Sequence, residues 1–504
     1  MSTQTTQLEP QDREQAQEIP SEVDPNSETI AAIATPPGVG GVGIVRISGP
    51  EAFAIGRALF RRSGTVDGAP FEPVSHLLTH GFVIDPATGE RVDEVLAAFM
   101  RAPRTYTRED VLEFQAHGGP LILRRILALA LANGARAAHP GEMTLRAFLN
   151  GRLDLAQAEA VMALISAESE AGRRLALRQL QGELSTRVQQ ARTAAMGALA
   201  RIEASIDFPD EEVPPPDPAE LAMLIAEAQA EVARLLAGAD RGRILREGLR
   251  VAIVGRPNVG KSSLLNALLR TERAIVTPIA GTTRDTVEER ASIGGIPVHL
   301  VDTAGLTPSD DPIERIGVAR SRAAARSADL LLFVLDGSEP LNDLDTAAAQ
   351  ELHALNTDEP ENETVRDSST SALPLMLLVL NKADLPAVTG EQEAQALWPG
   401  AQVVHSSTLS ADGVAALEQA ITALVLGGEA QSGDTLVASA RHADALRRAA
   451  EHLTAAQATL TGDLPLDFVS IDLRAALETL GEITGETATG DLLDRIFSEF
   501  CIGK

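Results

Sequence analysis

LRVAIVGRPNVGKS, residues 249–262, decides the fold of the middle of this 504-residue chain. A strand-like apolar run leads into the pattern G-x-x-x-x-G-K-S, and a helical pattern follows it. In such a loop the glycines let backbone N–H groups surround phosphates, a lysine reaches the outer phosphate oxygens, and the next hydroxyl binds Mg²⁺. We therefore expect a nucleotide site here, with Lys261 on the phosphates and Ser262 on the magnesium ion.

Two further motifs follow strand-like runs. Residues 302–305 read DTAG after the run 298–301, and residues 381–384 read NKAD after the run 375–380. Asp302 is expected near the magnesium shell, and the Gly305 amide near the γ-phosphate. The Asp384 carboxylate can accept two hydrogens from the N1 and exocyclic amine of guanine, a pair that adenine lacks. The three motifs in this order predict a GTP-binding domain.

Residues 281–285 (GTTRD) lie between the first two motifs, where a switch loop belongs. Thr283 is expected to coordinate Mg²⁺ when the γ-phosphate is present. In Ras-type domains a glutamine after D-x-x-G positions the attacking water, but Leu306 occupies that position here and cannot orient water. Either GTP hydrolysis is slow or another residue takes this role.

The periodicity of apolar residues divides the chain into domains. Short apolar strands alternate with helical stretches through the G domain, as in a doubly wound α/β sheet. Helical spacing precedes and follows this unit, which predicts a G domain inserted into an all-helical domain. An α+β pattern with a glycine loop at 38–43 comes first. The expected multidomain α/β chain comprises a disordered tail (1–27), an N-terminal domain (28–148), a helical domain (149–247 and 429–504) and a G domain (248–428).

Composition excludes several classes of protein. Lys and Arg number 43 against 71 Asp and Glu, so the net charge is −28. Such a chain needs a local basic patch or a partner to hold RNA. The single cysteine, Cys501, excludes internal disulfides and cysteine metal cages. No apolar run approaches the ~18 residues of a membrane span, and no signal segment begins the chain, so we expect a cytoplasmic protein without membrane contact.

Several segments resemble one family along nearly the whole chain. The P-loop with Asn258, the GTTRD switch, DTAGL and NKAD resemble the potassium-dependent TrmE-Era-EngA-like GTPases, which dimerise. The block 29–49, EDVLE at 109–113, HGGP at 117–120, LDLAQAEA at 153–160, DFPDEE at 207–212 and FCIGK at 500–504 are similar to the MnmE (TrmE) family of tRNA modification GTPases. The resemblance implies an N-terminal folate-binding and dimerisation domain, a helical domain and a Ras-like P-loop G domain.

The resemblance also implies an activity. Members act as homodimers with a flavoprotein, MnmG (GidA), whose cofactor is FAD. The pair adds an aminomethyl or carboxymethylaminomethyl group at C5 of the wobble uridine of certain tRNAs. The one-carbon donor is 5-formyl- or 5,10-methylene-tetrahydrofolate, and K⁺-stimulated GTP hydrolysis closes and opens the paired G domains.

Site residues follow from the resemblance, position by position. Glu314 matches the residue that orients the water, and would fill the role that Leu306 cannot. Asn258, Thr277, Ile279 and Thr282 match the K⁺ ligands. Folate is implied at Arg46, Glu113, Arg152 and Lys504. GTP contacts are expected at Asn258, Val259, Gly260, Lys261, Ser262, Ser263, Thr277, Pro278, Ile279, Ala280, Gly281, Thr282, Asp302, Thr303, Ala304, Gly305, Asn381, Lys382, Ala383 and Asp384.

Alternatives stay open at this point. Cys501 is either a thiol near the one-carbon centre or a small buried hydrophobe. The chain could also be a regulatory or ribosome-assembly GTPase that shares only the G domain, which would have no use for Arg46 and Glu113. A third reading is a folate-dependent one-carbon enzyme that the G domain merely gates, which folate binding without tRNA dependence would favour.

Overall fold

The computed structural model describes residues 28–64, 71–207, 216–271, 288–302, 322–357, 374–426, 435–462 and 464–503. The predicted tail and most of the predicted polar insert at 356–371 lie outside them. The chain divides into two compact units, Met1–Leu153 with Gly490–Lys504, and Asp154–Thr489. Residues 490–504, which the sequence analysis placed with the helical domain, therefore group with the N-terminal unit. The predicted multidomain α/β fold is confirmed.

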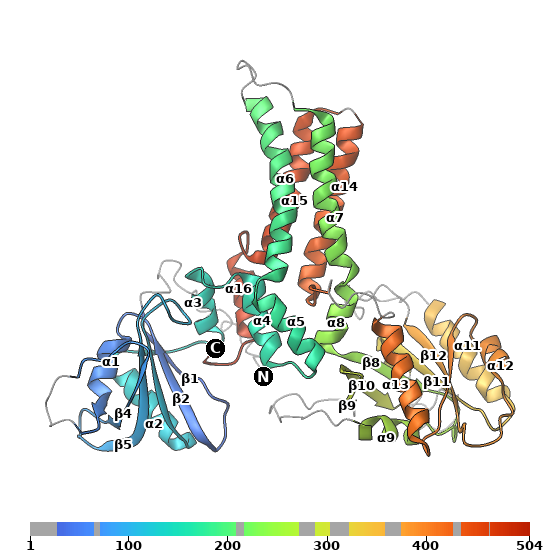
Figure 1. Ribbon diagram of the computed structural model, residues 1–504, viewed down its shortest axis with the longest axis horizontal. Helices are drawn as coiled ribbons and strands as arrows, with labels where there is room; N and C mark the ends of the chain where they lie inside the picture. Colours follow the sequence, from blue (N-terminus) through green and yellow to red (C-terminus); the bar gives the residue numbers. More distant parts are fainter. Residues whose placement is uncertain are drawn as a thin grey trace, which may run out of the picture. The chain divides into compact units, whose positions relative to one another are not determined.

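The first unit is built on a seven-stranded sheet with the order β3-β4-β5-β6-β2-β1-β7 (Figure 1). Adjacent strands are antiparallel, except that β1 and β7 are parallel. The helix α2 contacts the sheet over a buried aromatic and aliphatic core. The elements are β1 (Ile30–Ile33), β2 (Gly40–Ser48), α1 (Ala52–Leu59), β3 (Phe60–Arg62), β4 (Leu77–Ile84), β5 (Arg91–Met100), β6 (Val111–Gly118), α2 (Pro120–Ala132), β7 (Arg136–Ala137), α3 (Glu142–Leu149) and α16 (Gly490–Ser498).

The glycine segment 38–43 is only partly a loop. β2 begins at Gly40 and includes the rest of the segment, with an irregular register against β6 between Gly40 and Gly43. A Cβ on Gly43 would lie 2.4 Å from a methyl carbon of Leu123 on α2, so glycine is required where the helix packs onto the strand. Beyond this point the register places Arg46 directly opposite Glu113 on β6.

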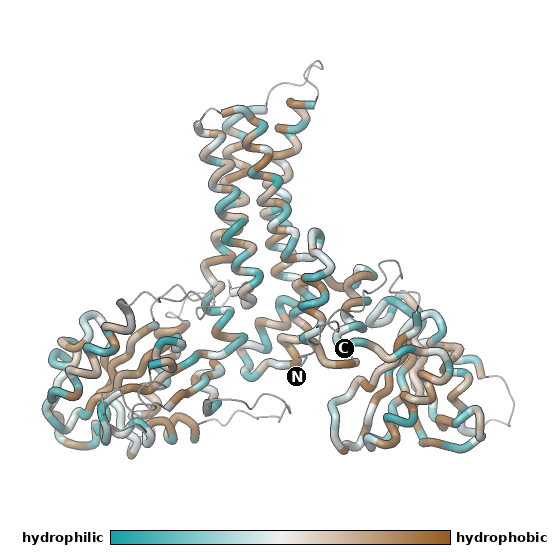
Figure 2. Tube along the Cα trace, turned by 180° about the vertical axis from the view of Figure 1, so that it is seen from behind, coloured by the Kyte–Doolittle hydropathy of each residue, from teal (hydrophilic) through white to brown (hydrophobic). Residues whose placement is uncertain are grey.

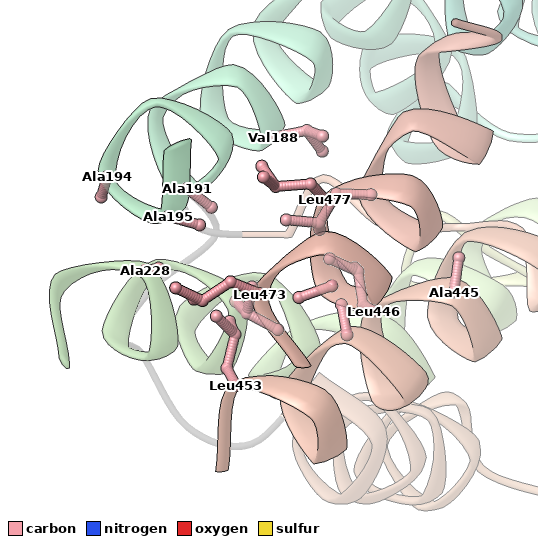
Figure 3. Close-up of a cluster of buried hydrophobic side chains, with 14 of the residues drawn as sticks. Val188, Ala191, Ala194, Ala195, Ala228, Ala445, Leu446, Leu453, Leu473 and Leu477 are labelled. Atoms are coloured by element: carbon pink, nitrogen blue, oxygen red, sulfur yellow. The ribbon is translucent and has the colours of Figure 1, made fainter. Parts of the chain in front are cut away.

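The helices of the second unit form an alanine- and leucine-rich core. Four long helices pack together: α6 packs on α7 and α15, and α14 packs on the same two helices. Each of the four therefore contacts two others of this group. Small alanines on α6 and α7 let the leucines of α14 and α15 approach closely (Figure 3). The helices are α4 (Leu155–Ile165), α5 (Glu170–Leu180), α6 (Glu183–Asp207), α7 (Pro218–Ala237), α8 (Ala239–Glu247), α14 (Ala440–Thr461) and α15 (Leu466–Thr484).

The second unit also contains a six-stranded sheet with the order β13-β12-β11-β8-β10-β9. Its strands are parallel except for β9, which pairs with β10 in the antiparallel direction. The elements are β8 (Leu249–Val254), α9 (Lys261–Thr271), β9 (Glu288–Ile293), β10 (Ile296–Asp302), β11 (Leu330–Asp336), α11 (Asp343–Thr357), β12 (Leu375–Asn381), α12 (Glu391–Leu397), β13 (Gln402–His405) and α13 (Ala411–Leu426).

Both faces of this sheet are covered. Along β8, Val251 and Ile253 belong to one buried cluster, whereas Ala252 and Val254 belong to the cluster on the opposite face. Figure 2 shows hydrophobic segments along these strands. The sequence analysis did not identify β9, since its polar alternation suits an edge strand rather than a buried one. Within the described residues, no helix has both the length and the apolar character needed to cross a bilayer.

Candidate functional site

The phosphate loop connects β8 to α9, at the carboxyl edge of the sheet. Gly255 (φ +147°) and Gly260 (φ +98°) adopt backbone conformations that favour glycine, and Asn258 is also left-handed with φ 68°. A Cβ on Gly255 would lie 2.4 Å from the carbonyl oxygen of Val334 on β11. The Lys261 ammonium donates hydrogen bonds to the carbonyl oxygens of Gly255 (2.8 Å) and Arg256 (2.9 Å). The loop thus has the tight curvature and the held cation that a phosphate site requires.

Arg256 anchors the outer side of this loop. Its guanidinium pairs with Glu339 at 2.7 Å and with Asp345 of α11 at 3.2 Å. Burial opposes the charged form of Arg256, but these carboxylates outweigh it and raise the pKa of the guanidinium. Arg256 therefore holds the loop against its neighbours instead of being available to a ligand.

The predicted base-recognition motif lies directly against the phosphate loop. The Asn381 amide nitrogen donates to the Val259 carbonyl oxygen at 2.7 Å, and a Cβ on Gly260 would lie 2.3 Å from that nitrogen. The Ser407 hydroxyl donates to one oxygen of Asp384 at 2.6 Å, which orients the carboxylate expected to read guanine. The structure therefore brings together the residues predicted to bind the phosphates and the base.

Lys382 completes the motif in a structural role. It has a φ of 61°, and its ammonium pairs with the buried Asp336 at the end of β11 at 2.5 Å. Burial alone would raise the pKa of Asp336, but hydrogen bonds from Lys382 and Ser338 outweigh it and hold that pKa below its usual range. This ion pair braces the loop that carries Asp384.

Part of the predicted nucleotide site lies outside the described residues. Asp302 ends β10 and pairs in register with Ile253, so its backbone lies beside the start of the phosphate loop. In the described ranges, no group of three or more His, Cys, Asp or Glu side chains is arranged for a metal ion. The predicted residues outside the described ranges are Thr277, Pro278, Ile279, Ala280, Gly281, Thr282, Thr283, Thr303, Ala304, Gly305, Glu314 and Lys504.

A second candidate site lies in the first unit, where three of the predicted folate residues meet. Arg46 donates to Glu113 at 2.8 Å, and their side chains are 16% and 15% exposed. The Tyr106 ring lies 5.8 Å from the Arg46 guanidinium carbon and 4.8 Å from that of Arg152. Arg152 also donates to the Tyr106 carbonyl oxygen at 2.9 Å. The structure thus groups Arg46, Glu113 and Arg152 around one aromatic ring.

Sequence reasoning did not identify Tyr106, the only tyrosine in the chain. Burial raises the pKa of its phenol, against the lowering effects of the Thr144 hydrogen bond and of the two arginines. Its ring supplies a flat apolar surface with two guanidinium groups nearby. The single occurrence of this residue type was the only available signal.

Cys501 is exposed, so the reading of this residue as a buried hydrophobe is wrong. The neighbouring backbone is held against the first unit, because Ile502 forms a bridge with Pro140. At Gly503 (φ +94°), an added Cβ would lie 2.5 Å from the Ile33 carbonyl oxygen. A chemical role for the thiol stays a prediction.

A buried ion network lies in the same unit and was not predicted. Arg146 is completely buried and pairs with Glu109 at 3.0 Å and Glu142 at 3.1 Å. Burial would raise the pKa of Glu142, but hydrogen bonds from Arg136 and from the His139 backbone help to hold it below its usual range. The network ties α3 to the loop before β6 and thereby supports the segment that carries Tyr106.

Comparisons with known proteins identify the family to which the chain belongs. A family model described as the MnmE helical domain matches residues 155–501, and one described as the GTP-binding protein TrmE N-terminus matches residues 29–152. The chain is similar to a tRNA modification GTPase MnmE from Chloroflexus aurantiacus, with 50% identity over 95% of this chain and all of the relative. A relative of the same description from Symbiobacterium thermophilum is 49% identical, over 95% of this chain and 99% of its own.

Solved structures are similar over a smaller part of the chain. A crystal structure of Era from Aquifex aeolicus is 26% identical and covers 40% of this chain and 65% of its own, with a TM-score of 0.25.

Proposed function

Because the chain belongs to the MnmE family of tRNA modification GTPases, we propose that it acts with a flavoprotein of the MnmG type to modify C5 of the wobble uridine in certain tRNAs. The group added is carboxymethylaminomethyl or aminomethyl. A tetrahydrofolate supplies the one-carbon unit, the partner supplies FAD, and two copies of the chain form the working dimer. GTP hydrolysis drives the conformational step.

The observation that supports the folate part is the convergence of Arg46, Glu113 and Arg152 on Tyr106. A pterin presents an amidine edge that a carboxylate such as Glu113 can read, and its ring system can lie against an aromatic face. The glutamate end of folate carries carboxylates that suit arginine forks. A switch GTPase without one-carbon chemistry would have no use for this set, so it is the weaker alternative.

The nucleotide site supports the GTPase part of the cycle. Lys261 and the loop amides would hold the phosphates, Asp384 would select guanine, and Ser262 with Thr283 would hold Mg²⁺. We assign K⁺ to Asn258, Thr277, Ile279 and Thr282. A cation beside the bridging phosphate oxygen supplies the positive charge that an arginine finger brings elsewhere.

Nucleoside mass spectrometry of tRNA tests the proposal directly. In cells that lack this gene, the C5 group on the wobble uridine should disappear and should return when the gene is restored. If the modification is unchanged without the gene, the proposed chemistry does not apply to this chain, and a switch GTPase becomes the better description.

Glu314→Ala is expected to lower the turnover of GTP about 100-fold while leaving GTP affinity almost unchanged, because a group that orients or deprotonates water acts mainly in the transition state. Single-turnover hydrolysis and a fluorescent-nucleotide titration measure the two quantities. Glu72→Ala, which removes an 81% exposed carboxylate of the first unit, serves as a control. Equal hydrolysis rates in Glu314→Ala and parent would remove Glu314 from the mechanism.

GTP hydrolysis is expected to be several-fold faster in KCl than in NaCl at equal ionic strength. The proposed oxygen ligands would have to contract around the smaller Na⁺ ion. Asn258→Ala should abolish this difference between the salts. Equal rates of the parent protein in both salts would contradict the cation site.

A further inference from the structure

A cavity of about 510 Å³ opens in the first unit next to the proposed folate residues. Tyr106 and Arg152 line it and belong to both places, whereas Arg46 and Glu113 do not line it. No aspartate or glutamate lines the cavity. Its remaining polar wall is formed by His76, Arg104, Thr105 and Arg108. The cavity is therefore a strongly basic surface in a chain whose net charge is −28.

Among the described side chains, the arginines of this cavity lack the carboxylate partners that four other arginines of the same unit have. Arg57, Arg125, Arg136 and Arg146 each pair with a carboxylate. Arg108 donates to the Asn150 carbonyl oxygen at 2.7 Å, and Arg152 donates to the Tyr106 carbonyl oxygen. Within the described ranges, no carboxylate forms an ion pair with Arg104, Arg108 or Arg152. Three guanidinium groups thus line one cavity, and no carboxylate of the described residues neutralises their charge. This arrangement favours an anionic ligand with several charges.

The backbone around the cavity is held in an unfavourable conformation. His76 (φ 64°) and Arg108 (φ 61°) are left-handed, and the other non-glycine residues of this kind in the described chain, Asn258 and Lys382, belong to the nucleotide site. Such a conformation is unfavourable for residues other than glycine. His76 is fixed by contacts of its ring nitrogens with the Ser75 hydroxyl and the Arg104 carbonyl oxygen, both at 2.7 Å. The surrounding structure therefore maintains this strained rim, as is common at ligand sites.

We propose that this cavity binds the oligo-γ-glutamyl tail of folate. The inference rests on the proposed folate binding and extends it. With the pterin near Glu113, the first glutamate of the ligand would reach Arg152, and each further γ-linked glutamate adds one α-carboxylate. Arg108 and Arg104 would donate pairs of hydrogen bonds to these carboxylates.

The charge of the chain favours this ligand over RNA. A tail of a few glutamates brings about as many negative charges as the cavity has arginines. A tRNA carries phosphates along its whole length, and the acidic surface elsewhere on the chain would repel them. The concave shape also suits a short flexible chain better than a duplex.

Isothermal titration of the full-length protein with 5-formyl-tetrahydrofolate monoglutamate and pentaglutamate tests the proposal. The pentaglutamate should bind about tenfold more tightly at low ionic strength, and this gain should shrink as salt is added. In the double variant Arg104→Ala/Arg108→Gly, the pentaglutamate should bind no better than the monoglutamate, whose affinity should be unchanged. Glycine at position 108 suits the left-handed backbone, so this variant should remain folded.

Arg124→Ala is the matched control, because Arg124 is an exposed arginine of α2 whose guanidinium contacts only the Pro120 carbonyl oxygen among described residues. Arg124→Ala should still bind the pentaglutamate about tenfold more tightly than the monoglutamate. Equal affinity of the parent for both ligands would overturn the tail site while folate binding stands. Binding of neither ligand would remove the folate proposal as well. If the double variant kept the tail gain but lost affinity for an anticodon stem-loop, the cavity would be an RNA site and the inference would be wrong.

Discussion

Asp384→Asn is expected to lower the affinity for GTP about 1,000-fold and to create binding of xanthosine triphosphate. The carboxylate accepts the two hydrogens of guanine N1 and its exocyclic amine, whereas an asparagine amide offers a donor that clashes with that amine. Xanthine has an oxygen in place of the amine and can accept this donor. The substitution should reverse the preference for GTP over xanthosine triphosphate. A reversed preference distinguishes a change in base recognition from a general loss of nucleotide binding.

The structure provides a graded control for this experiment. Ser407→Ala removes the hydroxyl that donates to Asp384 at 2.6 Å, so the carboxylate stays but is less well oriented. GTP affinity should then fall by about tenfold or less, the usual value of one hydrogen bond to a charged group, without any binding of the xanthine nucleotide. Fluorescent-nucleotide displacement with GTP, ATP and xanthosine triphosphate measures all three affinities. An Asp384→Asn protein that still prefers GTP would show that Asp384 does not read the base.

Arg146→Met is expected to destabilise the first unit by about 3 kcal/mol, because it leaves the buried Glu109 carboxylate without its cation and Glu142 with Arg136 alone. Arg146 is completely buried, while Glu109 and Glu142 are 10% and 8% exposed, so water cannot replace the lost partner. The Glu28 carbonyl oxygen also loses its 2.8 Å hydrogen bond. Hydrogen exchange of the β1 and β2 amides measures the loss within this unit alone, which a global melting curve of a two-unit chain would not.

Two further variants serve as controls for the effect of Arg146→Met on stability. Arg57→Ala removes an ion pair whose partners, Arg57 and Glu72, are 43% and 81% exposed, and should cost about 1 kcal/mol or less. Adding Glu109→Gln to Arg146→Met should recover part of the stability, because a neutral amide is cheaper to bury than an unpaired carboxylate. If Arg146→Met cost no more than Arg57→Ala, the buried network would contribute nothing measurable.

The stability of this unit should also depend on pH with a definite sign. Glu142 has its pKa below the usual range, so in the parent the stabilisation is present above the unfolded-state pKa and is lost as the pH falls through the folded-state pKa. In Arg146→Met, acid would neutralise the unpaired Glu109 carboxylate, so the difference in unfolding free energy between variant and parent should narrow toward low pH. Repeating the exchange measurement at two pH values checks this behaviour.

Motifs made of adjacent residues could be predicted from the sequence, together with the strands that lead into them. The phosphate loop and the NKAD segment each specify a chemistry through adjacent residues, and parallel strands bring their carboxyl ends to the same edge. The contact between Asn381 and Val259 therefore follows from two separately predicted segments. β9 was not predicted because only one of its two faces is buried. Its sequence of polar and apolar residues therefore resembles that of a polar loop.

The sequence by itself determined the family and the α/β architecture, because motif chemistry and strand periodicity are encoded over short spans. Tertiary structure alone decided which distant residues share a surface. It buried Arg146, although arginine is usually exposed, left Cys501 exposed, and brought Arg46 and Arg152 to the ring of Tyr106. It also gathered three arginines around one cavity. Burial and convergence depend on contacts between segments far apart along the chain, and no local pattern records those contacts.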